Sequence, residues 1–261
     1  MNKMKRTIIA FLTIILSVSI VFTGCSKSKK PERTLVLGLD NNFPPMGYLD
    51  DKGNLVGFDI DVAKEVCKRL NYELKLQPIN WLLKQQELDS GNVDCLWNGY
   101  TITEERLRDN LITEPYMKNR QILVVKSDSK IKSLDDMTGK KLGLQAGSSA
   151  EDALNASQDF KNKLGSVLQY DDNTAALMDL VAGGCDAVLI DEVVALHYVK
   201  TEPKCNVLDV SLADEEYGIA FRKSDKELCE AIEKTLKEMA ADGTLAKIST
   251  EWFGRDVTII K

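Results

Sequence analysis

One stretch of the chain reads Val93-Asp-Cys-Leu-Trp-Asn-Gly-Tyr-Thr-Ile-Thr-Glu-Glu-Arg106 and joins an apolar run to a polar one. The apolar run ends at Trp97 and predicts a short buried strand. The chain is then expected to turn at Gly99 and to begin a helix, with Thr101 or Thr103 as N-cap and two glutamates in its first turn. A buried strand that leads directly into a capped helix is typical of α/β proteins.

The same junction carries the elements of an anion site. Free backbone N–H groups at a helix start favour an anion. Arg106 lies within about one turn of that start, and its planar guanidinium suits a carboxylate. Donors, helix dipole and guanidinium could therefore converge on one small anion. The other interpretation is an ordinary capped surface helix with a solvated Arg106.

The flanking sequence continues this alternation of strands and helices. Amphipathic helices are predicted at residues 60–70 and 226–241. Strands are predicted at residues 34–39, 72–78, 122–125, 142–145, 187–190 and 217–221. Further helices are predicted at 82–90, 173–181, 192–199 and 245–253, with others beginning near Ser133 and Ser148. This rhythm implies an α/β architecture with mostly parallel sheets.

Two further segments have the character of binding sites. Residues 144–149 combine a strand end, a glycine turn and a helix start, another geometry that suits an anion. Residues 187–190 form an apolar strand that delivers Asp191 to its carboxyl end, where ligands bind in open α/β sheets. An aspartate there could pair with an ammonium group. It could equally cap the helix that begins at Glu192, and the two roles are compatible.

The N-terminus predicts an exported lipoprotein. A basic segment precedes an apolar run, residues 7–21, that is short for a membrane span. The run ends at Phe22-Thr-Gly-Cys25, which resembles a bacterial lipobox although Phe22 replaces the usual leucine. Residues 1–24 are then a lipoprotein signal peptide, and residues 25–32 a tether carrying acyl chains such as palmitate on Cys25. A simple anchor helix or a signal peptide without lipidation is the alternative.

Charge and composition exclude several other classes of protein. The formal charge of −6 becomes −9 once the three positive residues of segment 1–24 are removed, which argues against nucleic-acid binding. His197 is the only histidine and no CxxC pair occurs, so neither a metal nor another cofactor is expected. A disulfide among the cysteines after the lipobox stays open: Cys67, Cys95, Cys185, Cys205 and Cys229.

The segment Gly57-Phe-Asp-Ile-Asp-Val-Ala-Lys-Glu-Val-Cys-Lys-Arg-Leu70 resembles the signature of family 3 of the bacterial extracellular solute-binding proteins. These proteins are the polar amino-acid receptors of ABC importers. The remaining motifs of the family follow in the expected order: Asp40-Asn-Asn-Phe-Pro-Pro45, Thr101-Ile-Thr-Glu-Glu-Arg106, Gln145-Ala-Gly-Ser-Ser149, Ile190-Asp-Glu192 and Glu251-Trp-Phe-Gly254. The resemblance extends from about Thr34 to the C-terminus.

The resemblance implies a two-lobed, type II periplasmic-binding-protein fold, with mixed sheets flanked by helices and a two-strand hinge. Residues 33–122 plus 221–261 would form the first lobe, and residues 128–215 the second. Residues 123–127 and 216–220 would be the hinge strands. The lobes would close on a ligand that contacts both, and the closed form would dock on a permease.

The family's motifs also imply a role for individual residues. Arg106, Thr101 and Ser149 are expected to bind the ligand's α-carboxylate. Asp191 and the Gly99 carbonyl are expected to bind its α-ammonium group. The side chain would be contacted by the aromatic residues Phe43 and Trp81 and by three polar residues, Asp40, Asn98 and Gln145.

The predicted function is capture of a free polar amino acid for an ABC permease, by a monomer anchored through Cys25 on the extracytoplasmic face of the cell membrane. Three polar groups beside two aromatic rings favour cystine or glutamine, whereas Asp40 acting alone would favour lysine, arginine or histidine. A dehydratase-like enzyme of the same fold would need a spare carboxylate in the cleft, and the sequence offers no clear candidate. A sensory ligand-binding protein is the other alternative.

Overall fold

The computed structural model describes residues 31–260. The predicted signal peptide and the lipidation site at Cys25 lie outside these residues. Within residues 31–260 no helix has the length and apolar character that a membrane span requires.

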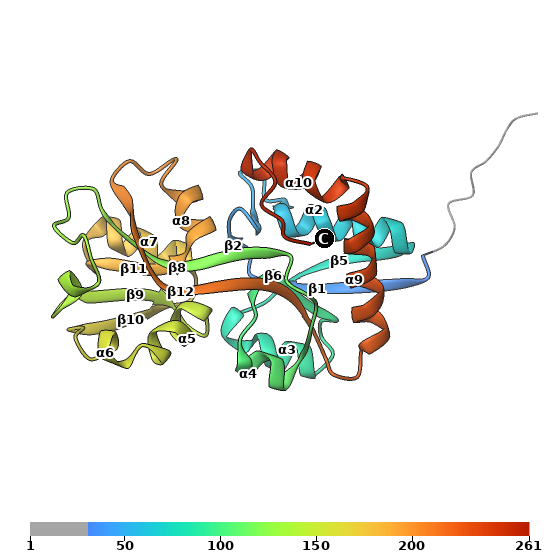
Figure 1. Ribbon diagram of the computed structural model, residues 1–261, viewed down its shortest axis with the longest axis horizontal. Helices are drawn as coiled ribbons and strands as arrows, with labels where there is room; N and C mark the ends of the chain where they lie inside the picture. The colour runs from blue at the N-terminus through green and yellow to red at the C-terminus, as the bar shows by residue number, and fades with distance from the viewer. Residues whose placement is uncertain (1–30, 261) are drawn as a thin grey trace, which may run out of the picture. The chain divides into compact units, whose positions relative to one another are not determined.

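Most of the described chain is organised around one large sheet (Figure 1). Its strands are β1 (Arg33–Leu39), β5 (Tyr72–Pro78), β6 (Cys95–Thr101), β7 (Leu111–Ile112), β8 (Met117–Lys126), β9 (Lys141–Gln145), β10 (Ser166–Tyr170), β11 (Ala187–Asp191) and β12 (Cys205–Phe221). Their order is β10-β9-β11-β8-β12-β6-β1-β5, with β7 paired to β12. A small second sheet consists of β2 (Asn42–Phe43), β3 (Gly47–Leu49) and β4 (Leu55–Val56).

Helices flank both halves of the large sheet, as Figure 1 shows. In the first half they are α2 (Phe58–Leu70), η1 (Trp81–Leu83), α3 (Lys84–Asp89), α4 (Glu104–Asp109), α9 (Lys226–Ala241) and α10 (Thr244–Phe253). In the second half they are η2 (Asp135–Met137), α5 (Ser149–Ala156), α6 (Gln158–Lys161), α7 (Asn173–Ala182) and α8 (Glu192–Tyr198). The helix expected to begin near Ser133 is thus only a 3-10 turn, because the chain leaves the helical conformation at Thr138, where ψ is 122°, and Gly139 adopts a φ of +72°.

The two halves of the sheet are parallel at their outer ends and antiparallel in the middle. β1 runs parallel to β5 and β6, and β9 runs parallel to β10 and β11. β12 runs antiparallel to both β6 and β8. We refer to the half with β1, β5 and β6 as the first lobe, and to the half with β9, β10 and β11 as the second lobe.

The long strands β8 and β12 connect the lobes. The part of β8 from Gln121 to Val125 also pairs with β11, in the second lobe. The part of β12 that begins at Tyr217 also pairs with β6, in the first lobe. The predicted hinge segments therefore lie largely inside the sheet. Residues 123–127 belong to the sheet of the second lobe and residues 216–220 to that of the first, since their apolar residues are buried there. The stretch without a third strand is 118–120 with 214–216, and we take it as the candidate hinge.

The segment from Val93 to Arg106 differs from its prediction in one respect. β6 continues through Gly99 to Thr101, so the chain does not turn at Gly99. Gly99 instead adopts a φ of +57° within the strand. A Cβ atom there would lie 2.8 Å from a ring carbon of Phe43, so this close approach excludes larger residues. Thr103 is the N-cap of α4, accepting the Arg106 backbone N–H at 3.2 Å.

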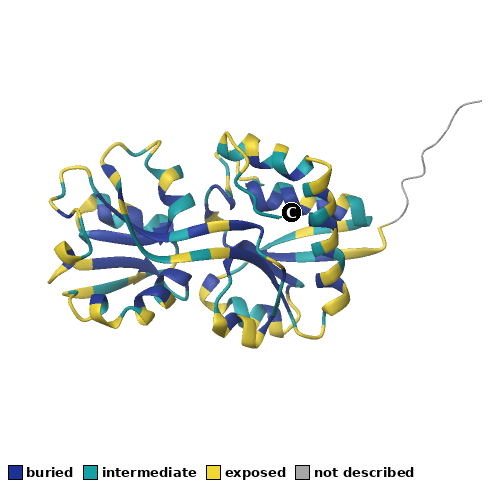
Figure 2. Ribbon diagram, viewed as in Figure 1, coloured by how far each residue is buried: buried dark blue, intermediate teal, exposed yellow. Residues whose placement is uncertain are grey.

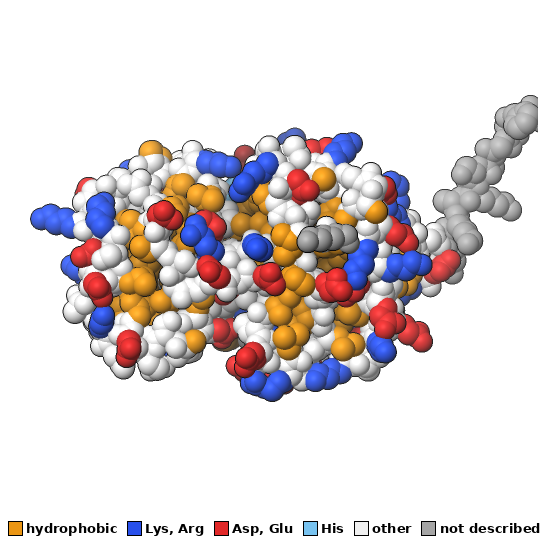
Figure 3. Space-filling model, viewed as in Figure 1, with side chains coloured by type: hydrophobic (Ala, Val, Ile, Leu, Met, Phe, Trp, Pro, Cys, Tyr) orange, Lys and Arg blue, Asp and Glu red, His pale blue; other side chains and the backbone are white. Residues whose placement is uncertain are grey.

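Buried side chains follow the strands and the inner faces of the helices, while the outer helix faces are exposed (Figure 2). The largest apolar cluster includes Leu37 of β1, Phe58 of α2 and Val188 of β11, and so extends through both lobes. Among residues 31–260 the five cysteines are buried, free thiols. On the face drawn in Figure 3, acidic and basic side chains are interspersed, which leaves no extended surface of one charge there.

Candidate functional site

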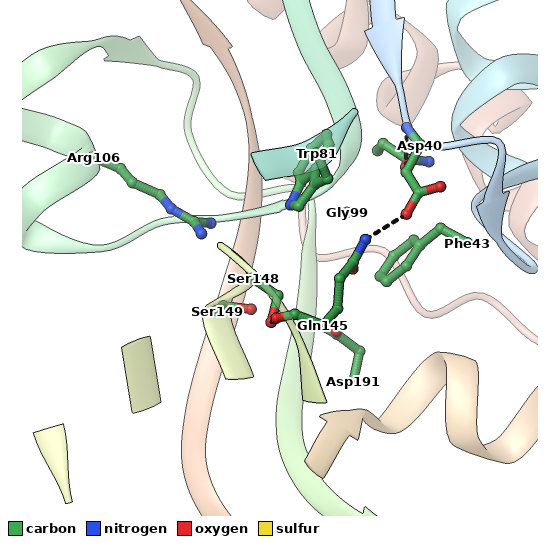
Figure 4. Close-up of a pocket in the computed structure, with 10 residues that line it drawn as sticks. Asp40, Phe43, Trp81, Gly99, Arg106, Gln145, Ser148, Ser149 and Asp191 are labelled. Carbon is green, nitrogen blue, oxygen red and sulfur yellow. Dashed lines mark hydrogen bonds between the residues drawn. The ribbon is translucent and has the colours of Figure 1, made fainter. Parts of the chain in front are cut away.

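The structure brings the predicted site residues together at one pocket between the lobes. All of them except Thr101 line it, and Ser148 joins them: Asp40, Phe43, Trp81, Asn98, Gly99, Arg106, Gln145, Ser148, Ser149 and Asp191. Figure 4 shows Arg106 approaching from one side, with Asp40 and Phe43 on the opposite side. Thr101 lies beside the pocket, its Oγ1 atom 3.0 Å from Ser149 Oγ.

These residues lie close together because several of them are at the carboxyl ends of strands. Asp40 directly follows β1, Gln145 is the last residue of β9, and Asp191 is the last residue of β11. β1 runs parallel to β5 and β6, and β9 and β11 run parallel to each other, so the carboxyl ends of these strands face the space between the lobes. Asn98 and Gly99 lie in the final part of β6. The pocket is therefore built mainly on rigid strands.

Arg106 is buried and held on several sides. Its side chain is 10% exposed, and its guanidinium stacks on the Tyr100 ring at 4.8 Å from the centroid. One guanidinium nitrogen donates to the Thr101 carbonyl at 3.0 Å, and another donates to Asp152 at 3.1 Å. This geometry excludes the solvated surface arginine that the sequence alone left open. Asp152, in the first turn of α5, accepts a hydrogen bond from a guanidinium nitrogen that could otherwise bind the carboxylate of a ligand.

Asp191 occupies the other pole of the pocket. It is 3% exposed, and its Oδ1 atom accepts from Asn119 at 2.7 Å and from the Tyr217 hydroxyl at 2.6 Å. Its side chain makes no capping bond to α8, so the sequence-based alternative of a simple helix cap does not describe it. Burial, together with the nearby charge of Glu215, raises the pKa of the Asp191 carboxyl well above its usual range.

The third part of the pocket combines donors and acceptors. Gln145 donates from its amide to Asp40 Oδ2 at 2.8 Å, across the cleft (Figure 4). Burial raises the pKa of the Asp40 carboxyl, although hydrogen bonds from the Asn42 backbone and Gln145 oppose this shift. The Asn98 amide nitrogen is buried without a partner among the described residues. An acceptor and an unused donor thus lie at one end of the pocket.

Several contacts across the cleft hold the lobes together in this structure. Besides the pairs made by Arg106 and Gln145, Lys84 of the first lobe donates to the Gly147 carbonyl of the second at 2.7 Å. Burial and the charge of Arg106 lower the pKa of Lys84 to about 8. The volume of the pocket that the centre of a water molecule can reach is about 10 Å³, which leaves room for about one water molecule. The cleft is therefore closed, and a free amino acid would need these contacts to separate.

Four residues in or beside the site were not predicted as site residues. Ser148 was predicted only as the start of a helix, and Asp152 was not singled out. Lys84 and Glu215 lie in segments whose sequence resembles an ordinary charged surface. No local pattern marks them, because their places in the site arise from tertiary structure. Asp152 and Lys84 make contacts across the cleft, and strand register brings Glu215 close to Asp191. Within residues 31–260, no group of three His, Cys, Asp or Glu residues is arranged to hold a metal.

Known proteins resemble this chain along almost its whole described length. Residues 35–255 match the bacterial extracellular solute-binding proteins, family 3. The L-cystine-binding protein TcyJ of Escherichia coli (strain K12) is 36% identical over 239 residues, covering 90% of this chain and 88% of that protein. The ABC transporter arginine-binding protein 1 of the same strain is 31% identical over 255 residues, covering 96% and 99%.

A solved structure gives a matching picture. An ABC uptake transporter substrate-binding protein from Streptococcus pneumoniae with bound histidine has a TM-score of 0.84 to this chain at 38% identity, covering 86% of this chain and 94% of that chain. Together with the mixed sheet described above, this likeness confirms the predicted type II periplasmic-binding-protein fold.

Proposed function

Because this chain belongs to family 3 of the bacterial extracellular solute-binding proteins, we propose that it captures a free polar amino acid between its lobes and delivers it to an ABC permease. The observation that carries this proposal is the pair of opposed poles. Arg106 offers a guanidinium from the first lobe, and Asp191 a carboxylate from the second. A zwitterion satisfies both, whereas a ligand lacking either charge would leave a buried group without its partner.

Hinge closure follows from the same arrangement. The pocket has room for about one water molecule, so the ligand enters an open form in which the contacts across the cleft are broken. Residues 118–120 and 214–216 have no third strand to restrain them, and we propose that they bend. A ligand that contacts both lobes then favours the closed form by its higher affinity for it. The permease would bind the closed form, in which the two lobes are in contact.

The ligand's side chain would lie toward Asp40, Asn98 and Gln145, between the rings of Phe43 and Trp81. Asp40 supplies an acceptor and Asn98 an unused donor. A side chain with both kinds of group, such as the amide of glutamine or the second zwitterionic end of cystine, satisfies this pair. A purely cationic side chain would satisfy Asp40 alone. Cystine is our first choice, and it is also what the similar protein TcyJ is named for.

A thermal-shift screen against all amino acids and cystine tests the proposed function. Ligand at a hundred times its Kd adds about 2.7 kcal/mol of stability, since it binds only the folded protein. For a chain of this size that corresponds to about 5–10 °C in Tm. We expect cystine and glutamine to give the largest shifts. A screen in which no amino acid raises the Tm above the scatter of the ligand-free protein would overturn the proposal.

We also propose that acyl chains on Cys25 anchor the protein on the extracytoplasmic face of the cell membrane. The support for this is the Phe22-Thr-Gly-Cys25 sequence after an apolar run. Replacing Cys25 with alanine is expected to move the protein from the membrane fraction to the soluble fraction. Cys67→Ala is the control, since that thiol is buried in the folded body. Membrane retention of the Cys25 variant, with no acyl group in the mass spectrum of the wild type, would refute lipidation.

A further inference from the structure

A second carboxylate lies beside Asp191 at the pole expected to bind ammonium. Glu215 of β12 and Asp191 both accept a hydrogen bond from the same amide nitrogen of Asn119, at 2.9 and 2.7 Å. Glu215 Oε2 also lies 3.0 Å from the Gln121 amide nitrogen and 3.1 Å from Thr101 Oγ1. The strand register explains this grouping, because Glu215 is directly opposite Asn119, and Asp191 is directly opposite Gln121.

The cluster has more acceptors than donors. Asn119 is 3% exposed and Gln121 is fully buried, and each directs its amide end toward the two carboxylates. Each amide nitrogen donates there, but the oxygens Asn119 Oδ1 and Gln121 Oε1 have no hydrogen-bond partner among the described residues. Buried acceptors without donors are costly, and an ammonium group brings three N–H donors and a positive charge. The cluster therefore has the chemistry of a site that receives a cationic nitrogen.

Other charged groups surround the pair without neutralising it. Tyr217 donates its hydroxyl to Asp191, and Arg106 donates to the Thr101 carbonyl and to Asp152. Glu215 lines a separate groove, which contains two basic and three further acidic residues: Lys118, Arg120, Glu192, Asp214 and Glu216. Arg120 is paired with Glu192. No basic side chain among the described residues is within salt-bridge distance of Asp191 or Glu215, so the cation must come from the ligand.

We propose that Glu215 is a specificity-determining residue, which forms with Asp191 a two-carboxylate receptor for the ligand's protonated primary amine. This inference rests on the proposed function and adds to the ammonium pole a residue outside the predicted set, which lines a separate groove rather than the pocket itself. One carboxylate would tolerate a neutral donor in place of ammonium. Two carboxylates close together penalise such a ligand more strongly, because their mutual repulsion then has no compensation.

Glu215→Gln tests the proposal, since glutamine keeps the shape and an acceptor oxygen but removes the charge. Calorimetry with the best amino acid from the screen should give an affinity about tenfold lower than wild type, as expected for loss of a charge-assisted contact. Affinity for the corresponding deaminated acid should instead rise, because the variant removes the uncompensated repulsion between the two carboxylates. Asp209→Asn is the matched control, because Asp209 lies on the same strand outside the candidate hinge and its side chain is 98% exposed.

The pH dependence of binding separates this role from a structural one. Wild-type affinity should fall in acid as the Asp191 carboxyl, whose pKa is raised by burial and by the charge of Glu215, takes up a proton. Removing the charge of Glu215 lowers the pKa of Asp191, so in Glu215→Gln the fall should move to lower pH. Affinity within about twofold of wild type, or a weakened affinity whose pH midpoint does not move, would overturn the inference. Failure of the wild type to bind any amino acid would overturn the proposed function, and this inference with it.

Discussion

Replacing Arg106 or Asp191 with alanine is expected to weaken amino-acid binding by at least a factor of about thirty. Each residue would pair with one charge of the ligand in a pocket that excludes water when closed. Removing one partner of a buried charge pair costs about 2–5 kcal/mol, much of it because the other charge stays buried and unpaired. A cost of 2 kcal/mol corresponds to about thirtyfold in Kd. Calorimetry on the purified variants measures this directly.

Changes in the ligand should follow the changes in the protein. An amide or ester of the amino acid lacks the carboxylate, so it should be much less sensitive to Arg106→Ala than the parent ligand is. A deaminated acid should likewise be less sensitive to Asp191→Ala. Combining protein and ligand changes in a double-mutant cycle assigns each charge to its partner.

Two exposed residues serve as controls for this experiment. Arg108 lies on α4 with Arg106 but is exposed, and the side chain of Asp209 is 98% exposed. Arg108→Ala and Asp209→Ala should bind like wild type. Near wild-type affinity for Arg106→Ala or Asp191→Ala would remove that residue from the site, and with it the account of recognition by two opposed charges.

The sequence is most informative where local pattern and burial coincide. The strand at 72–78 and the helix at 226–241 have the predicted bounds, because their alternation and their amphipathic spacing follow directly from what they bury. β12 was predicted only from Tyr217, although it begins at Cys205. Its first part is an edge strand of the second lobe that pairs only with β8, and much of it is half-exposed. The alternation of Leu208, Val210 and Leu212 with polar residues is short, and register shifts between Val207 and Ala213 interrupt the pairing.

The same distinction applies to the pocket. Arg106, Asp191 and Gln145 lie at strand ends or helix starts inside recognisable motifs, and the structure brings them together. Asp152 and Glu215 belong to no such motif. Their neighbours come from segments distant in sequence: Asp152 meets Arg106 from the other lobe, and Glu215 meets Asp191 through Asn119. Proximity that depends on tertiary structure leaves no trace in the local sequence.

The carboxyl of Asp59 is expected to be essential for stability, although Asp59 is not part of the pocket. Asp59 is the third residue of the Gly57-Phe-Asp segment and is completely buried in α2. Its Oδ2 atom accepts the Gly99 backbone N–H at 2.7 Å, and its Oδ1 atom accepts the Tyr116 hydroxyl at 2.9 Å. It therefore connects the first long helix to the strand that carries the pocket.

Asp59→Ala should lower the free energy of unfolding by about 2–4 kcal/mol, measured by urea denaturation. Two buried donors would lose their acceptor, and each unpaired group costs about 1–3 kcal/mol. Because Gly99 lines the pocket, the same variant should also bind the amino acid more weakly. Asp59→Asn is the matched comparison, since its amide oxygen can still accept the Gly99 N–H. An unfolding free energy of Asp59→Ala equal to that of the wild type would contradict this role.

Burial raises the pKa of Asp59 to about 7, against opposing hydrogen bonds from Gly99 and Tyr116. A carboxyl whose pKa is higher in the folded state binds its proton more tightly there than in the unfolded chain. The stability that this proton provides is complete below about pH 4 and is lost as the pH rises through about 7. Asp59→Asn cannot titrate and should lack this loss, on the order of a few kcal/mol. Asp191 shifts in the same direction, so the difference between wild type and Asp59→Asn isolates the contribution of Asp59. Parallel stability curves for the two proteins between pH 4 and 8 would mean that Asp59 does not titrate in this range, and that its carboxyl is held by hydrogen bonds strong enough to offset its burial.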